Sequence, residues 1–72
     1  MRTYVKFHFS SEGASPLEII RKVRERGWVP EVGQYDASKE FTKEEEYLNI
    51  VTELHEILKG TGTLYKLITK ER

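Results

Sequence analysis

The sequence contains no cysteine, only two prolines and a single methionine among its 72 residues. Without cysteine the chain forms no disulfide, and no Cys or His spacing suggests a structural zinc site. A chain this short buries only about 60% of its unfolded surface, so its core alone provides modest stability. We therefore expect a single domain, residues 1–72, that gains further stability from ion pairs or from self-association.

An excess of charge of one sign is also absent, because twelve Lys and Arg residues balance twelve Asp and Glu residues. Proteins that bind nucleic acids usually show a basic excess or a basic stripe. The zero net charge therefore disfavours a nucleic-acid partner. Charged residues make up 33% of the chain while thermolabile residues are few, a composition that resembles proteins from hot environments.

Long apolar runs are missing as well. No window approaches the roughly 20 apolar residues of a membrane-spanning helix, and the first residues show no signal-peptide pattern. We expect a cytoplasmic protein without a membrane partner. The two histidines, His8 and His55, have no HxxxH or HExxH spacing, so neither a metal site nor a cofactor is predicted.

The first segment that predicts structure is RTYVKFHFS, residues 2–10, in which side chains of two kinds alternate. Successive side chains of a strand point to opposite faces, so the alternation predicts a strand with one core face and one open face. The core face is expected to hold Thr3, Val5, Phe7 and Phe9. The open face is expected to hold Arg2, Tyr4, Lys6 and His8.

A first helix is predicted from its capping signals. Ser15, Pro16 and Glu18 have the spacing of a capping box with proline in the first helical position. Gly27 followed by Trp28 is typical of a Schellman ending, in which the residue after the glycine packs back on the helix. The apolar arc of this helix is expected to contain Leu17, Ile19, Ile20 and Val23.

A second helix is predicted between Thr42 and Gly60, with Glu45 completing another capping box. Its apolar arc covers roughly half of the helical wheel, which is wider than contact with one sheet requires. His55 falls beside this arc and is expected to be a packed boundary residue. The arc consists of Tyr47, Leu48, Ile50, Val51, Leu54, Ile57 and Leu58.

Three further strands are expected. Residues 28–32 contain Pro30, which cannot donate to a ladder, so this strand should lie at a sheet edge. Gly33 and Gln34 fit a two-residue type II′ turn that returns the chain along a weak strand or irregular loop, residues 35–41. Residues 63–70 predict a final strand with apolar side chains on both faces, Leu64 and Ile68 on one and Tyr65 and Leu67 on the other.

The order of elements is strand, helix, strand, weak strand, helix, strand. Two helices on one face of an open sheet predict a small α+β sandwich with a ferredoxin-like split βαβ arrangement. This scaffold is shared by many proteins and therefore says little about function.

The open face of the first strand is the candidate binding surface. Exposed aromatic rings can stack on bases while lysine and arginine hold phosphates, as on the sheet of an RRM domain. Residues 35–41 lack the aromatic motif that an RRM carries in its third strand. The predicted face consists of Arg2, Tyr4, Lys6 and His8, joined by Tyr65 or Tyr35.

Enzymatic motifs are absent. Residues 10–15, SSEGAS, precede a helix but have no phosphate-binding glycine pattern and no arginine of the kind an acylphosphatase has in this loop. Residues 60–63, GTGT, follow a helix C terminus, whose partial negative charge repels phosphate. No cysteine nucleophile exists, so we expect a non-enzymatic protein.

The sequence leaves three functions open. The first is a binding or assembly module that forms a homodimer through its sheet face or its second helix. The second is a domain that binds single-stranded RNA or DNA through the open face. The third is a sensor that binds a small molecule at a dimer interface.

Overall fold

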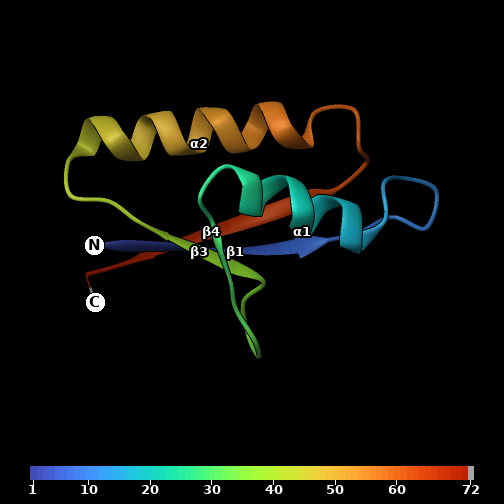
Figure 1. Cartoon of the computed structure of the whole chain (residues 1–72), viewed down its shortest axis with the longest axis horizontal. Coiled ribbons are helices and arrows are strands. Elements are labelled where there is room, and N and C mark those ends of the chain that lie inside the picture. The colour runs from blue at the N-terminus through green and yellow to red at the C-terminus, as the bar shows by residue number, and fades with distance from the viewer. Residues whose placement is uncertain (72) are drawn as a thin grey trace.

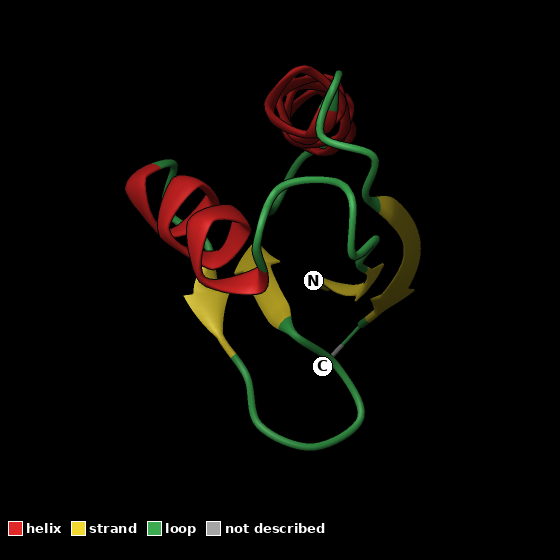
Figure 2. Ribbon diagram, turned by 90° about the vertical axis from the view of Figure 1, so that its right-hand side faces the viewer, coloured by secondary structure: helices red, strands yellow, loops and turns green. Residues whose placement is uncertain are grey.

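The computed structural model describes residues 1–71 and has an α+β fold (Figure 1). The elements follow in the order β1 (Arg2–His8), α1 (Pro16–Glu25), β2 (Val29–Pro30), β3 (Ala37–Glu40), α2 (Glu44–Leu58) and β4 (Leu64–Lys70). The strands form one sheet in the order β2-β3-β1-β4, and each pair of neighbours is antiparallel. Both helices cover the same face and leave the other face open (Figure 2). The predicted α+β class with two helices on one face of an open sheet is confirmed.

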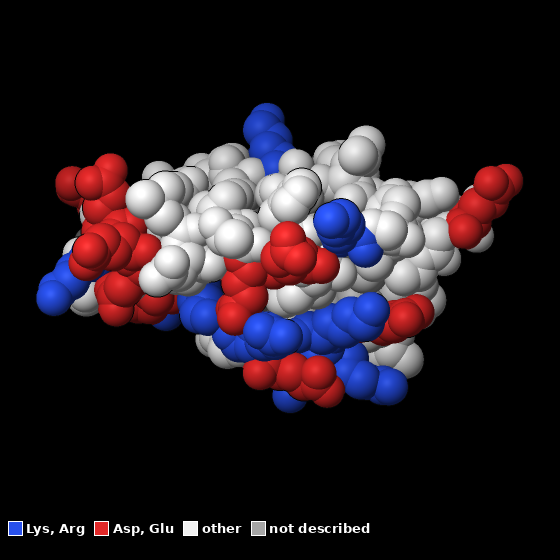
Figure 3. Space-filling view, turned by 90° about the horizontal axis from the view of Figure 1, so that it is seen from above, with Lys and Arg blue, Asp and Glu red and all other residues white. Residues whose placement is uncertain are grey.

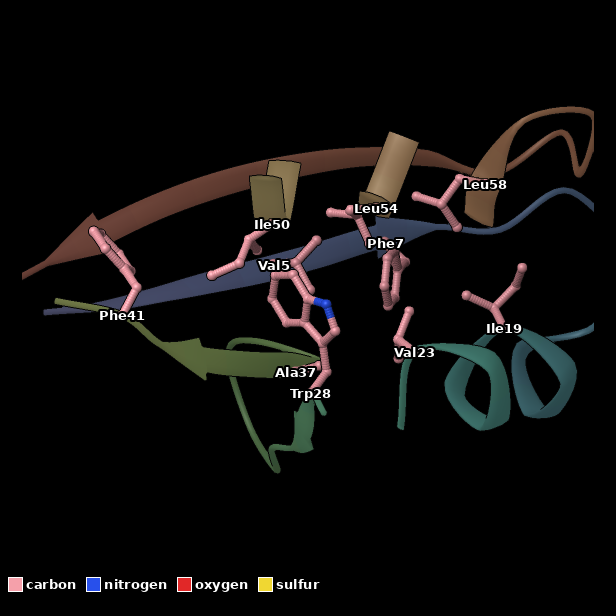
Figure 4. Close-up of a cluster of buried hydrophobic side chains, with 10 residues drawn as sticks. All are labelled: Val5, Phe7, Ile19, Val23, Trp28, Ala37, Phe41, Ile50, Leu54 and Leu58. Carbon is pink, nitrogen blue, oxygen red and sulfur yellow. The ribbon is translucent and has the colours of Figure 1, made fainter. Parts of the chain in front are cut away.

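The core lies between the sheet and the helices, as Figure 4 shows. Val5 and Phe7 of β1 point into it, as the alternation predicts. Full burial of such a side chain contributes roughly 1.5–3 kcal/mol. Phe9, predicted as the fourth residue of the core face of this strand, is 36% exposed because β1 ends at His8. The buried cluster consists of Val5, Phe7, Ile19, Val23, Trp28, Ala37, Phe41, Ile50, Leu54 and Leu58.

The predicted limits of α1 are confirmed. The Ser15 hydroxyl accepts a hydrogen bond from the Glu18 N–H (3.2 Å), and Pro16 begins the helix. At the other end the Trp28 N–H donates to the Val23 carbonyl (3.1 Å), which is the long hydrogen bond of a Schellman motif. Gly27 has φ +91°, a conformation that glycine adopts without steric cost. Leu17, predicted in the apolar arc, is instead 67% exposed.

The N-terminus of α2 is shifted by one residue from the prediction. Glu46, not Glu45, closes the cap, because the helix begins at Glu44 and the third position is therefore 46. Its Oε1 accepts from the Thr42 N–H (2.7 Å), the Thr42 hydroxyl (2.8 Å) and the Lys43 N–H (3.0 Å). These bonds, with Thr42 N–H contributing most, lower the pKa of Glu46 from 4.5 to about 2.

The hairpin between β2 and β3 departs from the predicted two-residue turn. Pro30 pairs with Ala37, so six residues connect the strands, and the Glu31 N–H closes this loop on the Asp36 carbonyl (3.0 Å). The Asp36 side chain takes the place of a backbone acceptor for β1, since its Oδ2 accepts a hydrogen bond from the Phe7 N–H (2.7 Å). The loop curls beneath the open face, on the side away from the helices (Figure 2). Pro30 lies on an edge strand, as predicted.

Candidate binding face of the sheet

The open face combines side chains from three strands and one loop. Strand register places Lys6 opposite Lys66, Tyr4 opposite Ile68 and Arg2 opposite Lys70. Because residues that pair across antiparallel strands share a face, β4 adds its even-numbered side chains to those of β1. We call this surface the cationic face; it consists of Arg2, Tyr4, Lys6, His8, Ser38, Glu40, Leu64, Lys66, Ile68 and Lys70, together with Tyr35 from the loop.

The predicted participation of Tyr65 in this face is wrong. Tyr65 pairs with Phe7, whose side chain lies in the core, and it packs against the core cluster on the helix side. The residues that the sequence analysis missed are Lys66 and Lys70. Both lysines alternate with Leu64 and Ile68 along β4, so all four side chains point to the same face of the strand. The sequence does not show that this is the open face, because the pairing of β4 with β1 must be known first.

An aromatic pair lies at the centre of the cationic face. The ring centroids of Tyr4 and Tyr35 are 5.0 Å apart at an interplanar angle of 38°. The Lys70 Nζ lies 5.4 Å from the Tyr4 centroid and 5.2 Å from the Tyr35 centroid. A cation over a partly exposed ring is stabilised by only about 0.5–1 kcal/mol, so a base or a phosphate can compete for both groups.

Beside this pair lie two cations with no opposing charge. Lys6 and Lys66 are exposed and directly opposite each other, and no carboxylate of residues 1–71 lies within 4.0 Å of either ammonium. Like charges in directly opposite positions destabilise a sheet. An anion between them would remove that cost, so this position favours a negatively charged ligand.

Arg2 differs from the lysines because its charge is already paired. Its guanidinium donates to the Ser38 hydroxyl and to the Glu40 Oε1, both at 2.8 Å. The Ser38 hydroxyl in turn donates to the Glu31 carboxylate. The β3 side of the cationic face is therefore neutralised, while the β1–β4 side keeps three lysines without a carboxylate partner among the described residues.

His8 ends β1 on the cationic face, opposite Leu64, and is exposed. His55 is also exposed on α2, so the prediction that it packs at the boundary of the core is wrong. Within residues 1–71 no three His, Asp or Glu side chains are placed together where they could hold a metal ion. In the same part of the chain no helix is long and apolar enough to cross a bilayer.

The glycine-containing loops pack against each other. The Ala14 N–H donates to the Thr61 carbonyl (3.0 Å), and a Cβ added to Gly13 would lie 2.1 Å from that oxygen. Only glycine permits this close approach of two backbones. This packing explains why residue 13 is glycine. It also occupies the Ala14 N–H and the Thr61 carbonyl, which are then not available to a ligand.

The helix side of the molecule carries charges of both signs, as Figure 3 shows. Acidic residues gather on α2, whose first turn is Glu44, Glu45 and Glu46. A net charge of zero is compatible with three lysines on the open face that have no carboxylate partner among the described residues.

Comparison with protein-family models, with curated proteins and with solved structures finds no match to this chain. The geometry of the cationic face is therefore the basis on which a function is proposed.

Proposed function

We propose that this chain is a non-enzymatic domain whose cationic face binds single-stranded nucleic acid. The observation that carries the proposal is the position of Lys6 and Lys66, which have no carboxylate partner among the described residues, beside the tilted Tyr4–Tyr35 ring pair. Phosphates supply the anions that the lysines lack. The tyrosine rings supply stacking surfaces that accept any base.

The geometry favours a single strand over a duplex. The aromatic rings lie on a sheet surface, where unpaired bases can stack, whereas the bases of a duplex are already stacked on each other. Lysine ammonium groups next to the rings match the alternation of base and phosphate along an extended strand. Neither helix is a long basic helix of the kind that enters a major groove, since α2 begins with three glutamates and α1, which carries the basic residues, is ten residues long.

The test compares two double variants with the same loss of charge. Lys6→Ala/Lys66→Ala removes the unpaired cations, and Lys22→Ala/Lys59→Ala removes two lysines that lie outside the face. Binding of fluorescein-labelled oligouridylate and oligothymidylate is followed by fluorescence anisotropy over a series of salt concentrations. We expect the first variant to bind more weakly, with a log–log salt slope reduced by roughly 0.7 for each phosphate that is no longer neutralised. The second variant should bind like the wild type.

A third variant separates stacking from charge. Tyr35→Ala should weaken binding about fivefold or more, because one base–aromatic stack contributes roughly 1–3 kcal/mol. Equal loss of affinity in both double variants would contradict the proposal, as would a wild type that shows no affinity at low salt. Competition by polyphosphate that is as strong as by the oligonucleotides would show a site for anions only.

We also propose that the fold belongs to the ferredoxin-like class. The strand order β2-β3-β1-β4 supports this assignment, because β1 and β2 each pair antiparallel with β3 and therefore run in the same direction on its two sides. The alternation of strands and helices along the chain supports it as well.

Self-association into a homodimer is the second candidate function. The specific observation is apolar side chains that α2 and β4 leave uncovered: Leu48 is 58% exposed and Leu64 is 71% exposed. The cationic face is a poor dimer surface, since two copies placed face to face would bring lysines together. The edge of the sheet is the better place to look for a dimer contact.

A further inference from the structure

The two edges of the sheet differ in their capacity to pair with another strand. The β2 edge has two paired residues, one of them Pro30, which has no N–H to donate. The β4 edge has seven residues in unbroken register with β1, no proline and no bulge. Within residues 1–71 no strand covers its outer side. A long edge strand without proline or bulge presents unpaired N–H and C=O groups, which are a template for a further strand.

The hydrogen bonds of β1 show which groups of β4 point outward. Val5 and Phe7 direct their backbone groups toward β3, since the Asp36 N–H donates to the Val5 carbonyl (2.9 Å) and its carboxylate accepts from the Phe7 N–H. The backbone groups of the even-numbered residues of β1 therefore form hydrogen bonds with β4, and their partners in β4 are also even-numbered. The N–H and C=O groups of Tyr65, Leu67 and Thr69 point away from the sheet.

We infer that β4 pairs antiparallel with β4 of a second copy of this chain, around a two-fold axis that passes between the two Leu67 residues. This inference deepens the self-association proposed above and depends on it. In this arrangement the outward groups of residues 65, 67 and 69 bond those of residues 69, 67 and 65 of the second copy. Two four-stranded sheets become one continuous sheet.

The side chains of β4 select this register. Centring on Leu67 pairs all seven residues and places each lysine opposite an apolar residue, Lys66 opposite Ile68 and Lys70 opposite Leu64. The lysine stems can then cover apolar surface while the ammonium groups stay in water. A shift by two residues shortens the pairing and brings lysines together, either Lys66 opposite Lys66 or Lys66 opposite Lys70, which is unfavourable.

The helix side of β4 is also self-complementary in this register. Tyr65 would lie opposite Thr69, an aromatic and β-branched pair that stabilises sheets. Leu67, half-buried in the single chain, would lie opposite Leu67 of the second copy. The pairing thus covers apolar side chains on both faces of β4.

The second copy would extend the candidate binding site. A two-fold axis perpendicular to the sheet keeps both open faces on the same side, so the lysine-rich sides of the two cationic faces meet at the dimer centre. Lys66 and Lys70 of both copies would then form one row across the junction. A nucleic acid strand long enough to cross the junction would contact both copies and bind more tightly than a short one.

Sedimentation equilibrium of the wild type and three variants tests the pairing. Ile68→Lys places a lysine opposite Lys66 of the second copy twice in each dimer. It should raise the dimer dissociation constant about tenfold or more. Ile68→Lys combined with Lys66→Glu converts both contacts to opposite charges and should restore the dimer. Val32→Lys, at a fully exposed apolar position of the loop, is the matched control and should remain dimeric.

Amide hydrogen exchange of the wild type provides a readout that needs no variant. The N–H groups of Tyr65, Leu67 and Thr69 should be protected at high protein concentration and exchange rapidly on dilution. Those of Lys66 and Ile68, which bond β1, should be protected at both concentrations.

The outcomes separate clearly. A wild type that is monomeric at every concentration, with fast exchange at residues 65, 67 and 69, overturns the dimer. A dimer that Ile68→Lys leaves intact overturns the β4 contact, and a failed rescue by the double variant overturns the register. Nucleic-acid affinity is measured separately, so its absence in a wild type that forms the β4 dimer would contradict only the proposed ligand.

Discussion

The two faces of β1 differ in what covers them and in what they carry. On the helix side Val5 is fully buried and Phe7 nearly so, and α1 and α2 supply their neighbours. On the open side Lys6 and His8 are exposed, and Tyr4 lies beside Tyr35 and the Lys70 ammonium rather than under a helix. The comparison shows that one strand can combine side chains chosen for stability with side chains that cost stability. The second kind suggests a binding role.

The largest expected effect tests the helix side. Leu54→Ala removes a fully buried side chain and should lower the free energy of unfolding by about 2–5 kcal/mol. Leu48→Ala, on the same helix but largely exposed, should change it by less than about 0.5 kcal/mol. Urea denaturation of both variants measures the difference. Equal effects would mean that α2 covers the sheet with a different face.

A smaller effect of opposite sign is expected on the open side. Lys66→Glu replaces a like-charge pair with an opposite-charge pair and should raise the free energy of unfolding by about 0.2–1 kcal/mol at low salt. The gain should shrink at high salt because both groups are exposed and screened. The same substitution should weaken binding of oligouridylate. A loss of stability would show that Lys6 and Lys66 do not repel each other.

The smallest effect concerns the cap of α2 and depends on pH. Because folding lowers the pKa of Glu46 from 4.5 to about 2, its carboxylate stabilises the folded chain above pH 4.5. This contribution is lost as the pH falls toward 2. Thermal melting of the wild type should therefore lose stability over this interval relative to Glu46→Gln.

Glu45→Gln serves as the control for that measurement. Glu45 accepts none of the three hydrogen bonds that close the cap, so its variant should follow the wild type as the pH falls. If Glu46→Gln follows the wild type just as closely, the cap bonds do not contribute to stability.

Local signals predicted the first half of the fold well. The Ser15 cap, the Gly27 ending and the burial of Thr3, Val5 and Phe7 depend on neighbours within a few residues, and all three are found. Phe9, also predicted on the core face of β1, is exposed. The cap of α2 was predicted one residue early because, of the three successive glutamates, Glu45 has the capping-box spacing from Thr42. Only the helix start at Glu44 selects Glu46 among them.

The predictions that failed depend on distant parts of the chain. A two-residue turn at Gly33 is incompatible with the pairing of Pro30 with Ala37 and with the hydrogen bonds between Asp36 and β1. Because these contacts form, the connection between β2 and β3 is a longer loop. Tyr65 was named as a candidate for the open face, although the last strand has apolar residues on both sides. Its sequence alone cannot show which side meets the helices.

The sequence by itself determined the two helices, the ends of α1 and the alternation of side chains along β1, because these depend on local backbone and side-chain chemistry. Only the tertiary structure decided that β4 lies beside β1 in the register that places Lys66 opposite Lys6. That register arises from the burial of Val5 and Phe7 against helices distant in sequence. A one-residue slip would turn every side chain of β4 to the other face.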